Sequence, residues 1–217
     1  MTAFYDCADE QQRATGITAA VSALKGGRLV VMPTDTVYGL AANAFDAEAV
    51  AALLAAKGRG RDMPVPVLVG SWHTIEGLVY SVPPAARELI RAFWPGALSL
   101  VVRQAPSLAW DLGDANGTVM LRMPLHPVAI ELLREVGPLA VSSANISGQP
   151  PAVTAAEARE QLGEQVEVYL EAGPSQRQAA STIVDLTGER PRILREGPVT
   201  VERIAEVLGV DPAALTA

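Results

Sequence analysis

Short apolar runs alternate with amphipathic segments along most of this chain. The runs at 29–32, 65–69, 98–103 and 118–122 have the length of buried strands, whereas over 11–24 apolar residues recur three and four positions apart, as in a helix. Strands and helices that alternate in this way must bury their apolar faces against one another. The sequence therefore predicts an α/β fold around a mixed sheet.

Cap signals and shorter apolar runs predict the remaining elements. Asp46 is a plausible N-cap of a helix, and Thr154 with Glu157 has capping-box spacing at the start of another. We expect further helices at 83–93, 127–135 and 201–208, strands at 139–141, 166–170, 182–185 and 192–194, and a loop from Ser142 to Val153. Because no internal repeat divides the chain, we expect one domain over 1–217 with a core from about 11 to 208.

Composition excludes several classes of chemistry. One cysteine, Cys7, and two histidines, His73 and His126, allow neither an internal disulfide nor a Cys/His zinc site. The net charge of −7 argues against a surface that wraps nucleic acid. An acidic N-terminus and the absence of a long apolar stretch predict a soluble cytoplasmic protein with no membrane segment. Hydrolase, dehydrogenase and Walker A motifs are also missing from the sequence.

Polar residues follow directly after the first predicted strand, in Pro33 to Leu40. Three hydroxyl groups (Thr34, Thr36 and Tyr38) and the carboxylate of Asp35 lie within five residues of one another. Strand ends are common positions for the sites of α/β proteins. A polar turn that satisfies its own backbone groups explains the same composition equally well.

Arginines and one lysine form a second group of candidates. Lys57, Arg59 and Arg61 alternate with glycines and could surround a polyphosphate, or could simply stabilise the C-terminus of a helix. Arg122, at the end of an apolar strand, must be paired or face a cavity, and its planar fork suits the carboxylate of an amino acid. A structural salt bridge is the alternative role of this arginine.

The segment from Ser142 to Pro150 also follows a strand. Its serines, Asn145 and Gly148 can offer donors to phosphate oxygens or to a purine edge, although many loops have this composition. Two shorter segments, from Ser181 to Asp185 and from Ile193 to Pro198, add hydroxyls and Arg195, which could complete a phosphate clamp.

The chain resembles the YrdC/Sua5 family of threonylcarbamoyl-AMP synthases through an ordered series of motifs. These are PTDTVYGLAANAFD, the AKGR run, FWPGALSLVV, TVMLRMPLHPVA, AVSSANISG, STIVD and ILREGP, which together cover nearly the whole chain. The resemblance implies a YrdC-like twisted mixed sheet with flanking helices around an open basic cavity. It also implies adenylyl transfer, in which ATP, L-threonine and bicarbonate yield threonylcarbamoyl-AMP and pyrophosphate for the t6A modification of tRNA.

The same resemblance assigns expected roles to individual residues. The positions expected at ATP are Lys57, Arg59, Arg61, Thr118, Ser143, Ala144, Asn145 and Arg195, with Lys57 and Arg59 as the catalytic cations. Those expected around threonine are Thr34, Tyr38, Arg122, Ser142 and Ser181. Mg²⁺ would arrive with ATP, without ligands from the protein. The product would pass to a separate threonylcarbamoyl transferase complex, and a direct contact with tRNA is possible.

The chain departs from the family pattern at several positions. Gly60, Met63 and Leu68 replace the proline, asparagine and histidine that often follow the AKGR run. Ser142 replaces a common proline, and Ala180 a common glutamate. Longer members carry an extra C-terminal domain, so this chain resembles the short, single-domain form. Two other functions stay open on the sequence: a noncatalytic double-stranded RNA- or tRNA-binding module, and a related enzyme that forms a different carbamoyl-adenylate.

Overall fold

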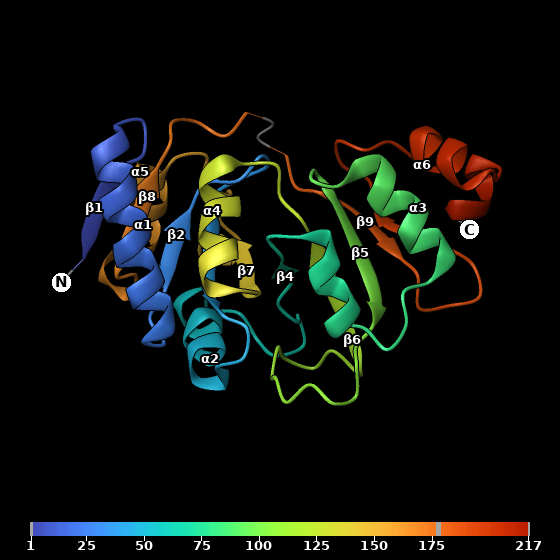
Figure 1. The fold of residues 1–217 in the computed structure, drawn as a ribbon, viewed down its shortest axis with the longest axis horizontal. Coiled ribbons are helices and arrows are strands. Elements are labelled where there is room, and N and C mark those ends of the chain that lie inside the picture. The colour runs from blue at the N-terminus through green and yellow to red at the C-terminus, as the bar shows by residue number, and fades with distance from the viewer. Residues whose placement is uncertain (1, 177–178, 217) are drawn as a thin grey trace.

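The computed structural model describes residues 2–176 and 179–216. Its centre is one twisted, mixed sheet of ten strands in the order β1-β8-β2-β3-β7-β4-β6-β5-β9-β10 (Figure 1). The strands are β1 (Ala3–Asp6), β2 (Val30–Met32), β3 (Gly39–Asn43), β4 (Val67–Leu68), β5 (Leu98–Arg103), β6 (Thr118–Arg122), β7 (Leu139–Ser143), β8 (Val168–Glu171), β9 (Thr182–Asp185) and β10 (Arg192–Arg195). Neighbouring strands far apart in sequence, such as β3 with β7 and β5 with β9, bring the predicted motifs together.

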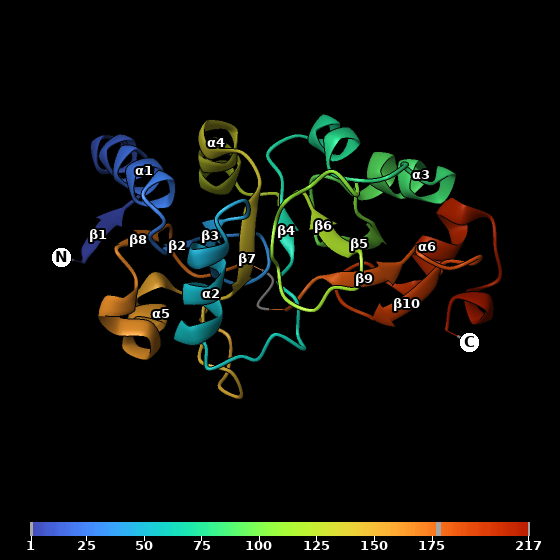
Figure 2. The same ribbon diagram turned by 90° about the horizontal axis from the view of Figure 1, so that it is seen from below.

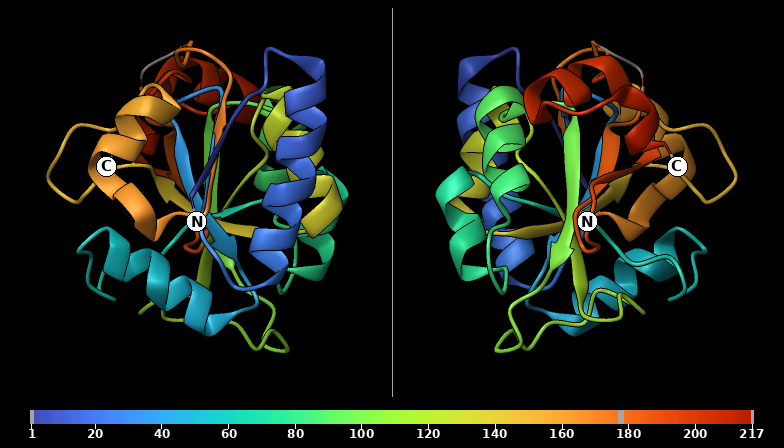
Figure 3. Two further views of the ribbon diagram at one scale, coloured as in Figure 1. Left: turned by 90° about the vertical axis from the view of Figure 1, so that its left-hand side faces the viewer. Right: turned by 90° about the vertical axis from the view of Figure 1, so that its right-hand side faces the viewer.

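Helices cover the two faces of the sheet unequally. The helices are α1 (Glu10–Lys25), α2 (Ala47–Ala56), α3 (Pro84–Phe93), α4 (Pro127–Val136), α5 (Ala155–Leu162) and α6 (Val201–Leu208), with 3-10 turns η1 (Trp72–Gly77), η2 (Gly163–Gln165) and η3 (Pro212–Leu215). Figure 2 shows α1, α4, η1 and α3 in one layer, whereas α2 and α5 lie on the opposite face beside β1, β2, β3 and β8. Viewed end-on in Figure 3, the sheet lies between these layers.

Side-chain caps mark the first residues of several helices. Asp9 accepts a hydrogen bond from the backbone N–H of Gln12 at 2.7 Å, and Asp46 accepts from two N–H groups of α2 at 3.0 Å each. The predicted caps Asp46 and Thr154 are therefore confirmed. Helix α2 ends at Ala56, and its C-cap residue Lys57 begins the loop that carries the predicted phosphate-binding cations.

Most predicted elements are present, and the differences fall at short or small-residue strands. The sequence analysis missed β1 and β3; β3 reads GLAAN, which has no β-branched or aromatic residue, so only its pairing with β2 and β7 makes it a strand. The loop predicted from Ser142 begins two residues too early, because β7 continues through Ser143 opposite β3. The strand predicted at 65–69 is confined to Val67–Leu68.

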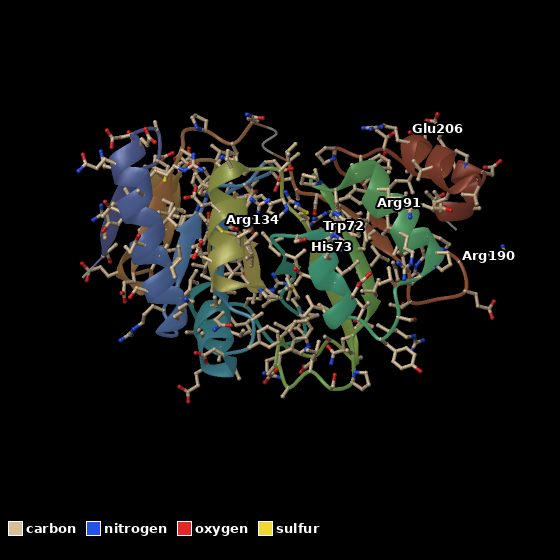
Figure 4. The ribbon with its side chains drawn as sticks, viewed as in Figure 1. Trp72, His73, Arg91, Arg134, Arg190 and Glu206 are labelled. Atoms are coloured by element: carbon tan, nitrogen blue, oxygen red, sulfur yellow. The ribbon has the colours of Figure 1, made fainter. Side chains whose placement is uncertain are left out.

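The two histidines lie in a 3-10 turn and at the start of a helix. His73 lies on η1, in the layer of α4 and α3, where its ring stacks on Trp72 with centroids 3.6 Å apart (Figure 4). His126 is the residue before α4, and its side chain makes no capping hydrogen bond. In the part of the chain that the structure describes, no helix is long and apolar enough to cross a membrane.

Replacing Asp46 with alanine should destabilise the protein, because two N–H groups at the start of α2 lose their acceptor. We expect the free energy of unfolding, measured by urea denaturation, to fall by about 1 kcal/mol. Glu48→Gln, in the same helical turn, is the control and should have a clearly smaller effect. If the free energy of unfolding fell equally in the two variants, the stabilisation would come from negative charge near the helix N-terminus and not from the capping hydrogen bonds.

Candidate active site

A cavity of about 360 Å³ opens on the part of the sheet formed by β4, β5, β6 and β7, and it collects most of the predicted site residues. Its walls come from the 33–39 segment, the loop after α2, β5, β6, β7, the approach to β9, and β10. Of the thirteen predicted positions, the cavity is lined by Thr34, Tyr38, Arg59, Arg122, Ser142, Ser143, Ser181 and Arg195. Lys57, Arg61, Thr118, Ala144 and Asn145 lie outside its lining.

Arg122 is held at the cavity by an ion pair with a neighbouring segment. Its guanidinium pairs with the carboxylate of Asp35, donates to Thr36 Oγ1 at 2.9 Å, and through Nε donates to the carbonyl oxygen of Gly96 at 2.9 Å. Both members of the pair are buried. The structure therefore contains the salt bridge that was the alternative role of Arg122, and it also places Arg122 in the cavity wall.

A chain of hydroxyl groups extends from Arg122 into the 33–38 segment. Arg122 can only donate, so Thr36 Oγ1 accepts from it and is left to donate to Thr34 Oγ1, 3.0 Å away. Thr34 in turn donates to the carbonyl oxygen of Val37 at 2.6 Å. The polar turn thus satisfies its own groups, as the structural interpretation proposed, while its residues form one wall of the cavity.

The hydroxyl of Tyr38 is directed away from the cavity that its residue lines. It lies 2.7 Å from both a carboxylate oxygen of Glu171 and the carbonyl oxygen of Gly173, and it accepts from the N–H of Ala172 at 2.9 Å. Burial raises the pKa of Tyr38, so the hydroxyl stays neutral. Tyr38 therefore contributes shape to the cavity, and its polar group links the segment before β3 to the end of β8.

Arg59 reaches the cavity from the loop after α2. Its guanidinium donates to the carbonyl oxygens of Met63 and Pro64 at 2.8 and 3.1 Å, and to Ser142 Oγ at 3.1 Å. Burial lowers the pKa of Arg59, although no arginine loses its charge near neutral pH. Met63, one of the departures from the family pattern, is exposed and contributes its backbone oxygen.

Arg195 and Ser181 form the opposite wall. Two nitrogens of Arg195 donate to the carbonyl oxygen of Ser181 at 3.0 and 2.8 Å, and the Ser181 hydroxyl lies 2.8 Å from that of Ser99. Ser99 was not predicted as a site residue. The sequence signal that could have identified Ser99 is a single hydroxyl inside the apolar run LSLVVR. Because successive side chains of a strand point to opposite faces, Ser99 lies on the face opposite to Leu98 and Leu100.

Lys57 and Asn145 lie behind the cavity wall and hold the segment after β7. The Lys57 ammonium donates to the carbonyl oxygens of Ser143 and Asn145 at 2.5 and 2.6 Å and is buried. The Asn145 amide donates to the carbonyl oxygens of Ile146 and Gln149. Ala144 is fully buried and donates its N–H to the carbonyl oxygen of Tyr38. These groups shape the backbone that a ligand would meet.

Two further predicted residues are near the cavity without lining it. Arg61 is half-exposed and forms a two-point ion pair with Asp111 at 2.8 and 3.0 Å. Thr118 shares a face of β6 with Met120 and Arg122, but its hydroxyl donates to the carbonyl oxygen of Ala115 at 2.7 Å.

The cavity is suited to an anionic ligand. Three guanidinium groups and several hydroxyls line it, and no aspartate or glutamate does among the residues that the structure describes. Its volume is in the range of small-molecule sites. In the described ranges, no group of three or more His, Cys, Asp or Glu residues could hold a metal ion. The guanidinium groups and hydroxyls that line the cavity are donors suited to phosphate and carboxylate oxygens.

Comparison with known proteins identifies the family. The family model for Sua5, YciO and YrdC proteins, described as "Telomere recombination", matches residues 22–197. A Mycobacterium tuberculosis protein named "Putative threonylcarbamoyl-AMP synthase" is 78% identical over 215 residues, which cover 99% of each chain. A Pyrococcus abyssi threonylcarbamoyl-AMP synthase is 37% identical over 89% of this chain and 57% of its own.

Solved structures share the fold. The Pyrococcus abyssi Sua5 protein complexed with L-threonine superposes with a TM-score of 0.88 and 34% identity, over 98% of this chain and 63% of that one. Escherichia coli YciO superposes with a TM-score of 0.83 at 23% identity, over 94% of this chain and all of that one, which supports the fold alone. The motif order, the near-complete alignments and the shared fold together place this chain in the Sua5/YciO/YrdC family.

Proposed function

We propose that this chain is a threonylcarbamoyl-AMP synthase. The observation that carries the proposal is 78% identity, along nearly the full length of both chains, to a protein of that name. The cavity supports it, since three arginines and several hydroxyls face a space suited to an amino acid and a nucleotide phosphate. The predicted transferase function is thereby favoured over a noncatalytic RNA-binding module.

The chemistry would proceed in two steps. The amine of L-threonine attacks the carbon of bicarbonate, and loss of water gives a carbamate. A carbamate oxygen then attacks the α-phosphorus of ATP, the bond from that phosphorus to the bridging oxygen breaks, and pyrophosphate leaves. Both steps need alignment of reactants and stabilisation of negative charge more than a protein nucleophile. A cavity of arginines and hydroxyls provides those two contributions.

The positions of the cations suggest how the two substrates divide the cavity. Arg59 and Arg195 approach it from opposite walls, from the loop after α2 and from β10, and we assign both to ATP phosphates. Arg122, fixed by Asp35, would bind the threonine carboxylate. Between these two groups of cations, the hydroxyls of Ser142, Ser143 and Ser181 would donate hydrogen bonds to the substrates. Lys57 and Asn145 would act on ATP indirectly, by holding the segment after β7 in place.

Mg²⁺ would enter as the MgATP complex. Magnesium in nucleotide sites keeps several waters and is held largely by substrate phosphates, so a cavity without carboxylates among its described residues is compatible with it. When bound, the ion would share the charge of the phosphates with the arginines. Bicarbonate as the carbon source, transfer of the product to a separate threonylcarbamoyl transferase complex, and direct contact with tRNA are further parts of the proposal.

The primary experiment incubates the protein with ATP, Mg²⁺ and bicarbonate, with and without L-threonine, and measures pyrophosphate together with the mass of the adenylate. We expect release that depends on threonine and a product of the mass of threonylcarbamoyl-AMP. Serine and carbamoyl phosphate serve as alternative substrates. A product from one of these, but none from threonine, would indicate a related carbamoyl-adenylate enzyme, and RNA binding without any adenylate would favour the RNA-binding module.

Arg122→Lys should raise the KM for threonine about tenfold or more, with a much smaller change in the KM for ATP. Lysine keeps the charge opposite Asp35 but loses the planar fork, and charge-assisted bonds of this kind contribute roughly 1.5 to 3 kcal/mol. Arg195→Gln is the matched variant and should act mainly on ATP. Similar changes in both KM values for Arg122→Lys would contradict its assignment to the carboxylate.

Lys57→Met should reveal a buried ammonium through the pH dependence of stability. Burial, together with the charge of Arg59, lowers the pKa of Lys57 to about 8 from its ordinary value of 10.5. Between these two pH values the unfolded chain binds more protons than the folded one, so the free energy of unfolding of the wild type should rise with pH relative to Lys57→Met. A difference that stays constant from pH 7.5 to 10 would show that the lysine keeps its ordinary pKa.

A further inference from the structure

Two loops meet beside the cavity, and only the first of them contributes residues that line it among those the structure describes. One, residues 58–66, follows α2 and carries Arg59; the other, residues 104–117, joins β5 to β6 and runs along the lower edge of Figure 1. Their backbones are paired, since Val65 donates to the carbonyl oxygen of Leu112 and Asp114 donates to that of Arg61, both at 2.8 Å.

Side chains reinforce this pairing. Arg61 donates from both terminal nitrogens to the two oxygens of Asp111, at 3.0 and 2.8 Å, and its Nε lies 3.4 Å from Asp114. Asp111 also accepts from the N–H of Gly113 at 3.2 Å, which orders the turn between the two aspartates. The hydrogen bond from Arg61 is the main cause of the lowered pKa of Asp111, so the pair is charged at neutral pH.

The close approach of the loops depends on a glycine. Gly113 has φ +99, and a Cβ built on it would lie 2.8 Å from the carbonyl oxygen of Arg61 and 3.2 Å from Cα of Pro64. On the other side of the 104–117 loop, Trp110 stacks on Phe45, just before α2, with ring centroids 5.5 Å apart. The 104–117 loop is thus attached to the chain both before and after α2.

The loop that is held in this way sets the position of Arg59. Two of the three acceptors of its guanidinium, the carbonyl oxygens of Met63 and Pro64, belong to the same 58–66 loop. A change in the path of this loop would move those acceptors, and with them the guanidinium that also reaches Ser142 in the cavity wall.

We propose that Arg61 and Asp111 are positioning residues whose ion pair holds the 58–66 loop so that Arg59 faces the bound nucleotide. Arg61 then acts on ATP through Arg59 and does not contact it, in place of the direct contact expected from the sequence. This assignment rests on the proposed function, because it takes ATP to be the ligand of Arg59.

The two possible roles of Arg61, positioning of Arg59 or direct contact with ATP, predict opposite effects of Asp111→Asn on ATP binding. If Arg61 touched a phosphate, removing the charge of Asp111 would free it, and ATP would bind equally well or more tightly. If the pair positions Arg59, neutralising either partner loosens the same loop. Because Arg61→Gln already removes the interaction that Asp111→Asn disrupts, together with the contact to Asp114, the losses from the two substitutions should not add.

The test measures the Kd of MgATP by calorimetry for the wild type, Arg61→Gln, Asp111→Asn and the double variant at one ionic strength. We expect each single variant to bind about three- to fivefold more weakly, as for a half-exposed ion pair, and the double variant to bind no more weakly than Arg61→Gln. An Asp111→Asn variant that binds as tightly as the wild type, or a double variant in which the losses multiply, would overturn the proposal.

Hydrogen exchange without ATP provides a second, independent measurement. The amides of Val65 and Asp114 should exchange faster in both single variants, whereas Arg28→Gln, which removes an exposed ion pair with Glu167 elsewhere in the chain, should leave them unchanged. If the amides of Val65 and Asp114 exchanged at the wild-type rate in Arg61→Gln, the proposal that the Arg61–Asp111 pair holds the 58–66 loop would be overturned. Failure of the wild type to bind MgATP would instead contradict the proposed function, and the exchange rates would still decide whether the pair orders the loop.

Discussion

A buried ion pair between Arg122 and Asp35 joins two parts of the chain on which the cavity depends. Arg122 ends β6, and Asp35 belongs to the segment between β2 and β3. Burying two charges costs several kcal/mol per ion unless other hydrogen bonds compensate. Here Thr36 and the carbonyl oxygen of Gly96 accept from Arg122, and the N–H of Leu125 donates to Asp35. The other Asp35 oxygen is buried and makes no hydrogen bond to the described residues.

Backbone carbonyl oxygens accept hydrogen bonds from the cations in and behind the cavity wall, and Arg122 pairs in addition with the carboxylate of Asp35. Arg59 is held by two such oxygens, Arg195 by that of Ser181, and the Lys57 ammonium by two from the segment after β7. Donors fixed before the ligand arrives need little reorganisation when charge develops in a transition state, which is how preorganised sites lower barriers. This construction also explains how a chain with a net charge of −7 presents a basic interior, because the cations gather where neutral carbonyls, not carboxylates, are their usual partners.

Much of the fold could be predicted from the sequence, because periodicity and caps are local signals. The strands at 98–103 and 118–122 and the cap at Asp46 agree with the structure. Local signals fail where tertiary pairing decides, as in β3, whose alanines form a strand only between β2 and β7. The site shows the same division. Motif position predicts which loops reach the cavity, but it cannot distinguish Arg59, which lines the cavity, from Arg61 two residues later, which pairs with Asp111.

Arg59 and Arg61 differ in position because the backbone of their loop is held in one path. Once the backbone of the 58–66 loop is fixed against Leu112 and Asp114, Arg59 and Arg61 are held by different neighbours, the first in the cavity wall and the second at the exposed edge. An exposed ion pair stabilises a folded chain only weakly. It can still matter for binding, because two of the acceptors that hold the guanidinium of Arg59 belong to the same loop. A weak interaction at the rim can therefore control the direction of a strong one inside the cavity.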